Sequence, residues 1–198
     1  VSVLSESLAI DASKNNKNKT KAEALREVKS FIQNVHHFRD ECLENNSPPT
    51  ERIVIFDEAQ RAYDLEKTKS FMKRNKNKPD FNFSETEFLI ISMDRHTGWT
   101  AIVCLVGGGQ EINKGEGGME EWLKALRDKF PDWKVWISNA LDSKYYLPTF
   151  NLDQLNGRLF RRDNLHLSIS IRSFRSEKVA QYISNLLEGN IAETKNLL

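Results

Sequence analysis

The chain has 198 residues, which is enough for one domain with a large core, or for one and a half domains. Its 29 basic and 28 acidic residues give a net charge of +1, so overall charge neither requires nor excludes a nucleic-acid partner. Its apolar runs are much too short for a membrane-spanning helix, so no membrane partner is expected. Cys42 and Cys104 fit buried thiols in a reducing cytoplasm. No Cys or His pair has zinc-ligand spacing except His36-His37, which point in different directions on a predicted helix.

The first half of the chain is predicted to be mainly helical. A short strand at 1–4 and a short helix at 5–11 precede a polar loop at 13–21 that is rich in lysine and asparagine. Apolar residues at helical spacing predict one long amphipathic helix over 21–44, and Ser47-Pro48-Pro49 ends it. An apolar strand at 52–56 follows. Helices are predicted over 59–73 and 84–95, and Ser84 with Glu87 forms the capping box of the second.

The second half alternates strands with helices. A strand over 99–106 is broken by Gly107-Gly108-Gly109, and an amphipathic helix follows Gly117-Gly118. A further strand is predicted at 133–137, and alternating apolar and polar residues predict another at 165–171. A last helix is predicted at 176–187. Strands that alternate with helices predict an α/β fold with a mostly parallel sheet.

The strand at 52–56 ends in two adjacent carboxylates, Asp57 and Glu58. P-loop NTPases present their Walker B acids in this way: the first carboxylate holds Mg²⁺ and the second polarises the water that attacks the γ-phosphate. An ordinary strand followed by an acidic helix N-terminus would give the same pattern. The flanking residues Ala59-Gln60-Arg61 and a second motif downstream favour the NTPase interpretation.

That second motif is the glycine run 107–109 followed by Gln110. Three glycines allow the backbone to turn tightly and to approach a ligand closely, and a glutamine there can bond a γ-phosphate or its attacking water. Alone, the pattern also fits a plain loop. Its position about fifty residues after Asp57-Glu58 matches the order and spacing of helicase motif III.

Three segments, at 54–61, 106–112 and 171–175, together resemble the superfamily 1-like P-loop NTPase module of the Schlafen-related DNA/RNA helicase family. Stretches at 31–40 and 116–122 resemble the same family, so the likeness spans nearly the whole chain. It implies a RecA-like core with a mostly parallel sheet flanked by helices. We expect residues 1–160 to form part of a first RecA-like domain with Walker B and motif III. Residues 161–198 would supply the motif IV strand and helix that lead into a second RecA-like domain.

The resemblance also implies site residues. Asp57 would coordinate Mg²⁺ and Glu58 would activate water. Gln60 and Gln110 would sense the γ-phosphate, and Gly108-Gly109 would lie against the nucleotide.

Arginines complete the implied site. Arg172 resembles the motif IV arginine that approaches the phosphates, because a guanidinium suits phosphoryl oxygens; a surface salt bridge is the alternative. Arg61 is expected to pair with an acid or to touch nucleic acid. Arg158, Arg161 and Arg162 form a basic cluster that fits either a nucleic-acid backbone or a solvated surface.

The chain departs from the family in one respect, because it contains no G-x-x-x-x-G-K-[ST] phosphate-binding loop. It also begins with Val1. We therefore expect a fragment, truncated at its N-terminus, of a protein that uses ATP and Mg²⁺. By itself the chain is expected neither to bind ATP tightly nor to hydrolyse it.

The leading functional hypothesis is a nucleic-acid-dependent ATPase, a helicase or translocase acting on single-stranded DNA or RNA. The alternatives are a nucleotide-dependent regulatory switch that unwinds nothing and a non-catalytic binding module, against which the intact Asp57-Glu58 pair argues. Stacking on exposed bases would favour the motor. Most of the candidate aromatic side chains are expected in the core; the candidates are Trp99, Trp122, Trp133, Trp136, Tyr145 and Tyr146.

Overall fold

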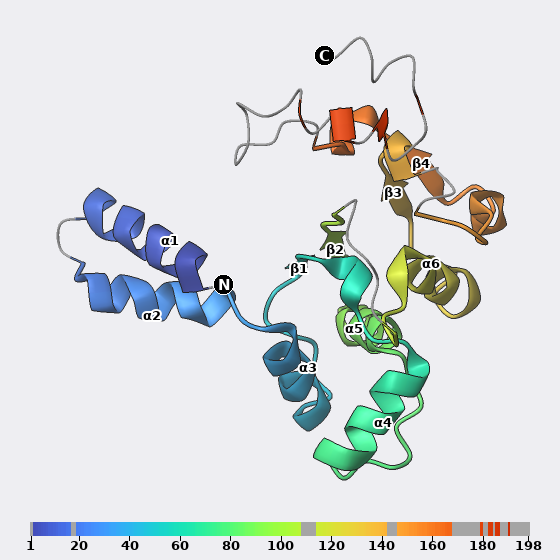
Figure 1. Ribbon diagram of the computed structural model, residues 1–198. Coiled ribbons are helices and arrows are strands. Elements are labelled where there is room, and N and C mark those ends of the chain that lie inside the picture. The colour runs from blue at the N-terminus through green and yellow to red at the C-terminus, as the bar shows by residue number, and fades with distance from the viewer. Residues whose placement is uncertain are drawn as a thin grey trace. The chain divides into compact units, whose positions relative to one another are not determined.

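The computed structural model describes residues 2–16, 19–107, 114–141 and 146–167, together with residues 179, 182, 183, 185, 186 and 190. The chain divides into two compact units, Val1–Pro131 and Asp132–Leu198, and each is described by itself (Figure 1). The division expected after residue 160, between parts of two RecA-like domains, stays a prediction.

The first unit begins with two helices that pack side by side, α1 (Ser2–Asn15) and α2 (Lys21–Phe31) (Figure 1). Their contact is built on Ala9, Ala24 and Val28, whose small or branched side chains let the two backbones come close. The strand predicted at 1–4 is wrong, because residues 2–4 belong to α1.

The single long helix predicted over 21–44 is also wrong. Helix α2 ends at Phe31 and α3 (Val35–Glu44) begins afresh. Asn34 is the N-cap of α3, where its side chain accepts a hydrogen bond of 3.0 Å from the backbone N–H of His36. An asparagine favours the start of a new helix over the continuation of the preceding one, because its side chain can cap the new N-terminus. The spacing of apolar residues carries no information on such a cap, so it did not predict the break.

A parallel pair of strands forms the sheet of this unit. In it β1 (Ile53–Phe56) pairs with β2 (Ala101–Cys104), with Phe56 opposite Cys104. The Phe56 ring contacts Phe38 of α3 and Trp122 of α6 (Gly118–Asp128), at 6.1 and 5.8 Å between ring centroids.

An apolar run such as 53–56 is typical of a strand buried on both faces, but β1 is covered on one face only. Ile53 and Ile55 are 53% and 64% exposed, whereas Val54 and Phe56 on the other face are partly buried. Successive strand residues point to opposite faces, and the helices α3 and α6 contact β1 through the face that carries Phe56.

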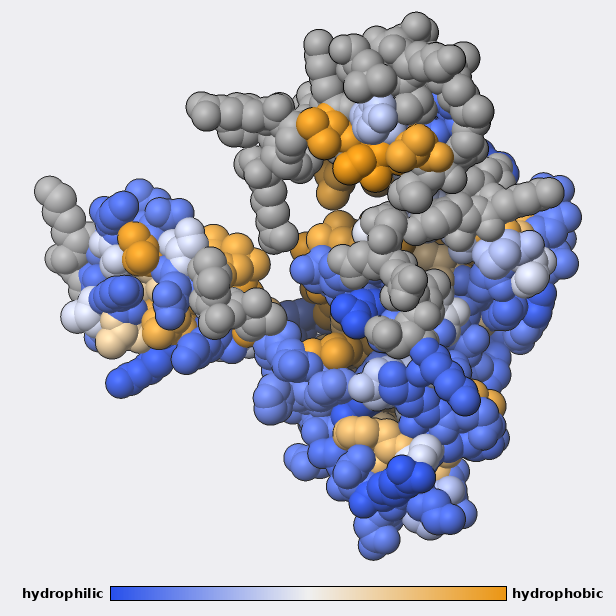
Figure 2. All heavy atoms as spheres, in the orientation of Figure 1, coloured by the Kyte–Doolittle hydropathy of each residue, from blue (hydrophilic) through white to orange (hydrophobic). Residues whose placement is uncertain are grey.

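A short 3₁₀ helix and two α-helices lie between β1 and β2 in the chain. The helix predicted over 59–73 is in fact a short 3₁₀ helix, η1 (Ala59–Arg61), followed by α4 (Leu65–Asn75). Asp64 caps α4 by accepting a hydrogen bond of 2.8 Å from Lys67 N–H, which fixes where this helix starts. Hydrophilic side chains cover most of the visible face of α4 (Figure 2). The capping box of Ser84 and Glu87 is confirmed at the start of α5 (Glu85–Asp94).

The second unit contains another parallel pair, β3 (Val135–Ile137) and β4 (Leu159–Arg161). Three short 3₁₀ helices accompany it: η2 (Asn139–Leu141), η3 (Leu152–Leu155) and η4 (Asp163–Leu165). The strand predicted over 165–171 is wrong at its first residue, because Leu165 ends η4, and residues 168–171 lie outside the described residues. The described residues within the predicted helix 176–187 are helical.

Helices combined with parallel strand pairs confirm the α/β fold class. Among the residues that the structure describes, none of the helices has the length and apolar composition needed to cross a membrane.

Candidate functional site

The carboxyl ends of β1 and β2 lie side by side in the first unit. Leu105 N–H donates to the Phe56 carbonyl at 2.8 Å, and Ala59 N–H donates to the Leu105 carbonyl at 3.0 Å. Gly107 follows directly, and a Cβ added there would lie 3.7 Å from Gln60 Nε2. The structure therefore brings the Asp57-Glu58 motif next to the first residue of the glycine run.

We call residues 57–62 the acidic turn. Asp57 is exposed, and its Oδ1 accepts a hydrogen bond of 3.1 Å from Glu58 N–H. Glu58 is partly buried and has a left-handed backbone, with φ of 55° and ψ of 41°. The other non-glycine residues with positive φ in the described part of the chain are Asn77 and Asn156, and asparagine tolerates this region far better than glutamate.

Gln60 lies against Glu58 from inside the protein. Its side chain is only 4% exposed, and its Nε2 donates to Glu58 Oε2 at 3.0 Å. Its Oε1 is buried and has no hydrogen-bond partner within the described residues. A buried acceptor without a donor costs free energy, so this atom marks a position where a ligand or a water molecule would be stabilised.

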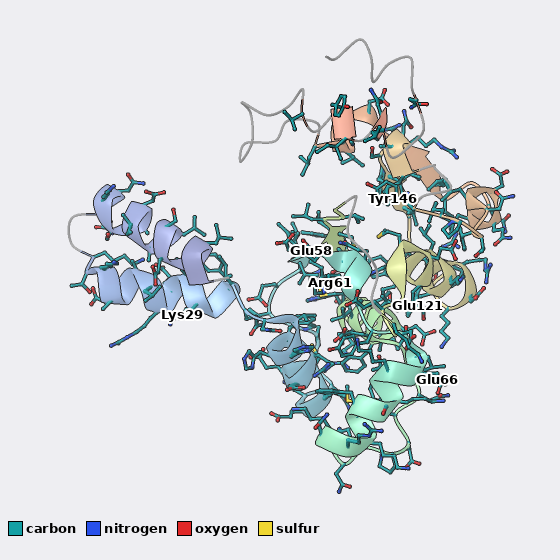
Figure 3. The ribbon with its side chains drawn as sticks, viewed as in Figure 1. Lys29, Glu58, Arg61, Glu66, Glu121 and Tyr146 are labelled. Atoms are coloured by element: carbon teal, nitrogen blue, oxygen red, sulfur yellow. The ribbon has the colours of Figure 1, made fainter. Side chains whose placement is uncertain are left out.

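Helix α6 and the residues before it hold the acidic turn in place. The Trp122 indole N–H donates to the Ala59 carbonyl at 2.8 Å in a buried contact. Gly117 N–H donates to the Ala62 carbonyl at 2.8 Å. Arg61 Nε lies 3.4 Å from Glu116 Oε1, so Arg61 pairs with an acid (Figure 3 labels Arg61 beside Glu58).

A buried ion pair supports the end of the turn. Glu85 Oε1 accepts a hydrogen bond of 3.0 Å from Arg39 Nη1, and its Oε2 accepts one of 3.0 Å from Tyr63 N–H. Glu85 N–H in turn donates to the Tyr63 carbonyl at 3.0 Å. Arg39 is completely buried and lies over the Phe71 ring, 4.5 Å from its centroid. These contacts lock the first residue of α5 to the backbone that follows the acidic turn.

The donor set of the acidic turn suits a magnesium–nucleotide complex. Mg²⁺ prefers oxygen ligands and takes only one or two from protein carboxylates, the rest coming from phosphates and water. The exposed carboxylate of Asp57 beside Glu58 provides such ligands. Within the described ranges, no three His, Cys, Asp or Glu side chains gather as they do in an all-protein metal site.

Other sequence-predicted residues are not brought into this site. Gly108, Gly109, Gln110 and Arg172 lie outside the described residues. The basic cluster of Arg158, Arg161 and Arg162 belongs to the second unit, around β4.

The comparisons with known proteins place the chain in a family. The family described as Schlafen group 3, DNA/RNA helicase domain, matches residues 1–198. The chain belongs to this family. No curated protein and no solved structure matches the Schlafen group 3 chain. Membership supports a helicase-like role in general, and it agrees with the resemblance carried by the sequence motifs.

Sequence reasoning missed four parts of the candidate site: the backbone conformation of Glu58, the Trp122 bond, the Glu116 partner of Arg61, and the Glu85–Arg39 pair. The Glu116 position had a local signal, because it stands between two glycines, Gly115 and Gly117. The Trp122 bond and the Glu85–Arg39 pair join distant parts of the chain, for which the sequence carries no spacing rule, and no turn residue such as Gly or Asn marks the left-handed backbone at Glu58.

Proposed function

We propose that this chain carries the Walker B part of a RecA-like P-loop NTPase, and that the protein is a nucleic-acid-dependent ATPase, a helicase or translocase. The observation that carries the proposal is the conformation of Glu58. A glutamate held in a sparsely populated backbone region, at the carboxyl edge of a parallel strand pair, indicates a constraint that stability does not explain. The family's description as a DNA/RNA helicase domain supports the same direction.

In the proposed site Asp57 holds Mg²⁺ through its exposed carboxylate. When bound, the ion would neutralise negative charge on the transferred phosphoryl group. The other proposed binding groups follow the sequence motifs: Gly108 and Gly109 lie against the nucleotide, and Gln110 senses its γ-phosphate. Arg172 is proposed to stabilise the phosphoryl oxygens.

Glu58 is the proposed residue that orients the attacking water and accepts its proton. The bond from Gln60 Nε2 to Glu58 Oε2 fixes the carboxylate, and the left-handed turn sets its direction relative to Asp57. Gln60 is also proposed to sense the γ-phosphate. Its buried Oε1 would then gain a donor when the nucleotide and its water are present.

The test is ATP turnover with and without single-stranded DNA or RNA. The assay compares the 198-residue chain with the full-length protein, because residues 1–198 contain no G-x-x-x-x-G-K-[ST] loop. In the full-length protein, Glu58→Gln is expected to lower kcat by about 10²–10⁴-fold, the usual contribution of a general base. Glu66→Gln makes the same chemical change at an exposed position of α4 and is the matched control.

Turnover stimulated by nucleic acid and lost in Glu58→Gln supports the proposal. ATP turnover that does not change when nucleic acid is added would favour a nucleotide-dependent switch over a helicase or translocase. Equal turnover by Glu58→Gln and Glu66→Gln would remove Glu58 from the mechanism.

A further inference from the structure

The parallel pair in the second unit stacks two aromatic rings on one face. Trp136 of β3 lies directly opposite Phe160 of β4 in the strand register. Their ring centroids are 5.2 Å apart and their planes meet at 23°, which is a stacked arrangement. Trp136 is 53% exposed, although its neighbours Val135 and Ile137 are buried. Trp136 therefore presents aromatic surface to solvent instead of contributing to the core of its unit, and the partly buried Phe160 ring supports it from one side.

Basic residues flank this aromatic pair along both strands. Arg162 continues β4 with an extended backbone, and its N–H donates to the Ile137 carbonyl at 2.9 Å. Alternation along extended chains places Arg162 on the side of Phe160, and Lys134 on the side of Trp136. Both cations are exposed, and neither forms an ion pair within the described part of the chain.

The geometry fits one class of ligand. Lys134 and Arg162 stand four register positions apart along the pair, about 13 Å at the usual rise of a strand, with the rings between them. A positive charge at each end and an aromatic ring in the middle are complementary to a short stretch of single strand, whose bases can stack on the ring while its backbone phosphates meet the charges. An apolar protein partner would leave both cations desolvated and unpaired, at a cost in binding.

We propose that Trp136, Phe160, Lys134 and Arg162 form a binding face for single-stranded nucleic acid, on which a base stacks against Trp136. This inference rests on the proposed function, which includes a nucleic-acid partner, and it names the residues that would bind that partner. Stacking tolerates any base, because every base has a π face, so the expected binding is largely independent of sequence. A duplex keeps its bases stacked inside and is expected to bind this face more weakly.

The test measures the binding of a labelled oligothymidylate by fluorescence anisotropy in the absence of ATP. A labelled duplex of the same length is measured for comparison. Trp136→Ala in the 198-residue chain is expected to weaken binding by about 5- to 150-fold, the usual range for loss of one stacked base. Trp136→Phe keeps a ring and is expected to retain most of the affinity. Trp99→Ala is the matched control, because Trp99 is 59% exposed and also has an arginine nearby, with Arg52 5.7 Å from its ring centroid.

The salt dependence tests the flanking charges separately. Lys134→Gln and Arg162→Gln are each expected to reduce the slope of log affinity against log salt by about 0.7, the value for one phosphate contact on a single strand. Circular dichroism of each variant confirms that it is folded, and a folded Trp136→Phe that restores binding excludes a loss caused by unfolding.

Three results would overturn the inference: equal binding by Trp136→Ala and the original chain, an equal loss in Trp99→Ala, or equal binding of duplex and single strand. If the original chain binds the oligonucleotide and Trp136→Ala binds equally well, only the proposed face fails. If the original chain binds no oligonucleotide at all, the proposal of a nucleic-acid partner is wrong as well as the proposed face. The role of the acidic turn in ATP hydrolysis is still tested separately by the turnover of Glu58→Gln.

Discussion

The buried pair of Arg39 and Glu85 offers a sharp test of how the acidic turn is supported. Glu85→Gln keeps the size of the side chain but removes its charge. The amide oxygen can still accept a hydrogen bond from Tyr63 N–H, and the amide N–H₂ then faces the Arg39 guanidinium, which cannot accept. Arg39 is left with Asp40 Oδ1 at 3.4 Å, a longer contact than the 3.0 Å bond it loses.

The magnitude follows from the burial of both groups. Arg39 is 0% exposed and Glu85 is 2% exposed, so neither charge can be hydrated by bulk water when its partner is removed. Breaking a buried pair by removing one partner typically costs about 3–5 kcal/mol, and the longer contact with Asp40, at 3.4 Å, compensates the buried Arg39 charge only in part. We expect Glu85→Gln to reduce the free energy of unfolding by an amount in this range. Arg39→Met is expected to cost a similar amount.

The assay is urea denaturation followed by circular dichroism, for the original chain, the two single variants and the double variant. The double variant leaves no lone charge, so its cost is expected to be smaller than the sum of the two single costs. Lys124→Gln is the control, because it removes an i,i+4 pair with Glu120 within α6 in which the lysine side chain is 43% exposed, and helical i,i+4 pairs are worth only about 0.3–0.5 kcal/mol. Additive single costs, or a Glu85→Gln cost no larger than that of Lys124→Gln, would refute the reasoning.

Further predictions concern individual groups. Trp122→Phe removes the buried bond to the Ala59 carbonyl and is expected to cost about 1–3 kcal/mol in urea denaturation, with no change in far-UV circular dichroism. Burial raises the pKa of the Cys104 thiol to about 12, so at pH 8 a disulfide reagent is expected to label it far more slowly in the folded chain than in urea. For Asp40, burial raises the pKa, but the bond from Lys76 and the charge of Arg39 outweigh it, and the folded value is lowered. The stabilisation is therefore complete above the unfolded pKa of about 4 and is lost as pH falls through the folded value; Asp40→Asn should flatten that part of a stability–pH profile.

Local signals in the sequence predicted the parts of the fold that depend on neighbouring residues. Ser84 and Glu87 stand three residues apart, which is all that a capping box requires, and the box is present. Strands at 52–56 and 99–106 were predicted as members of a mostly parallel sheet, and β1 and β2 are parallel. Family membership was likewise readable from three short motifs in order.

What the sequence could not predict depends on small energy differences or on distant contacts. The break before α3 turns on one Asn34 cap, worth about 1 kcal/mol, against a continuous apolar periodicity. Strand β4 has three residues, Leu159–Arg161, which is too short for a period of two to show. Glu85 and Tyr63 are 22 residues apart, and no pattern joins them.

The left-handed backbone of Glu58 has a consequence for attempts to engineer this chain. A non-glycine residue in that region costs on the order of 1 kcal/mol or more, and glycine adopts it without a steric penalty. A library selected only for thermal tolerance would thus enrich Gly or Asn at position 58 and discard the carboxylate. Selection for stability would favour Gly or Asn at position 58, whereas selection for ATP turnover would favour Glu, so stabilising libraries should keep residue 58 fixed.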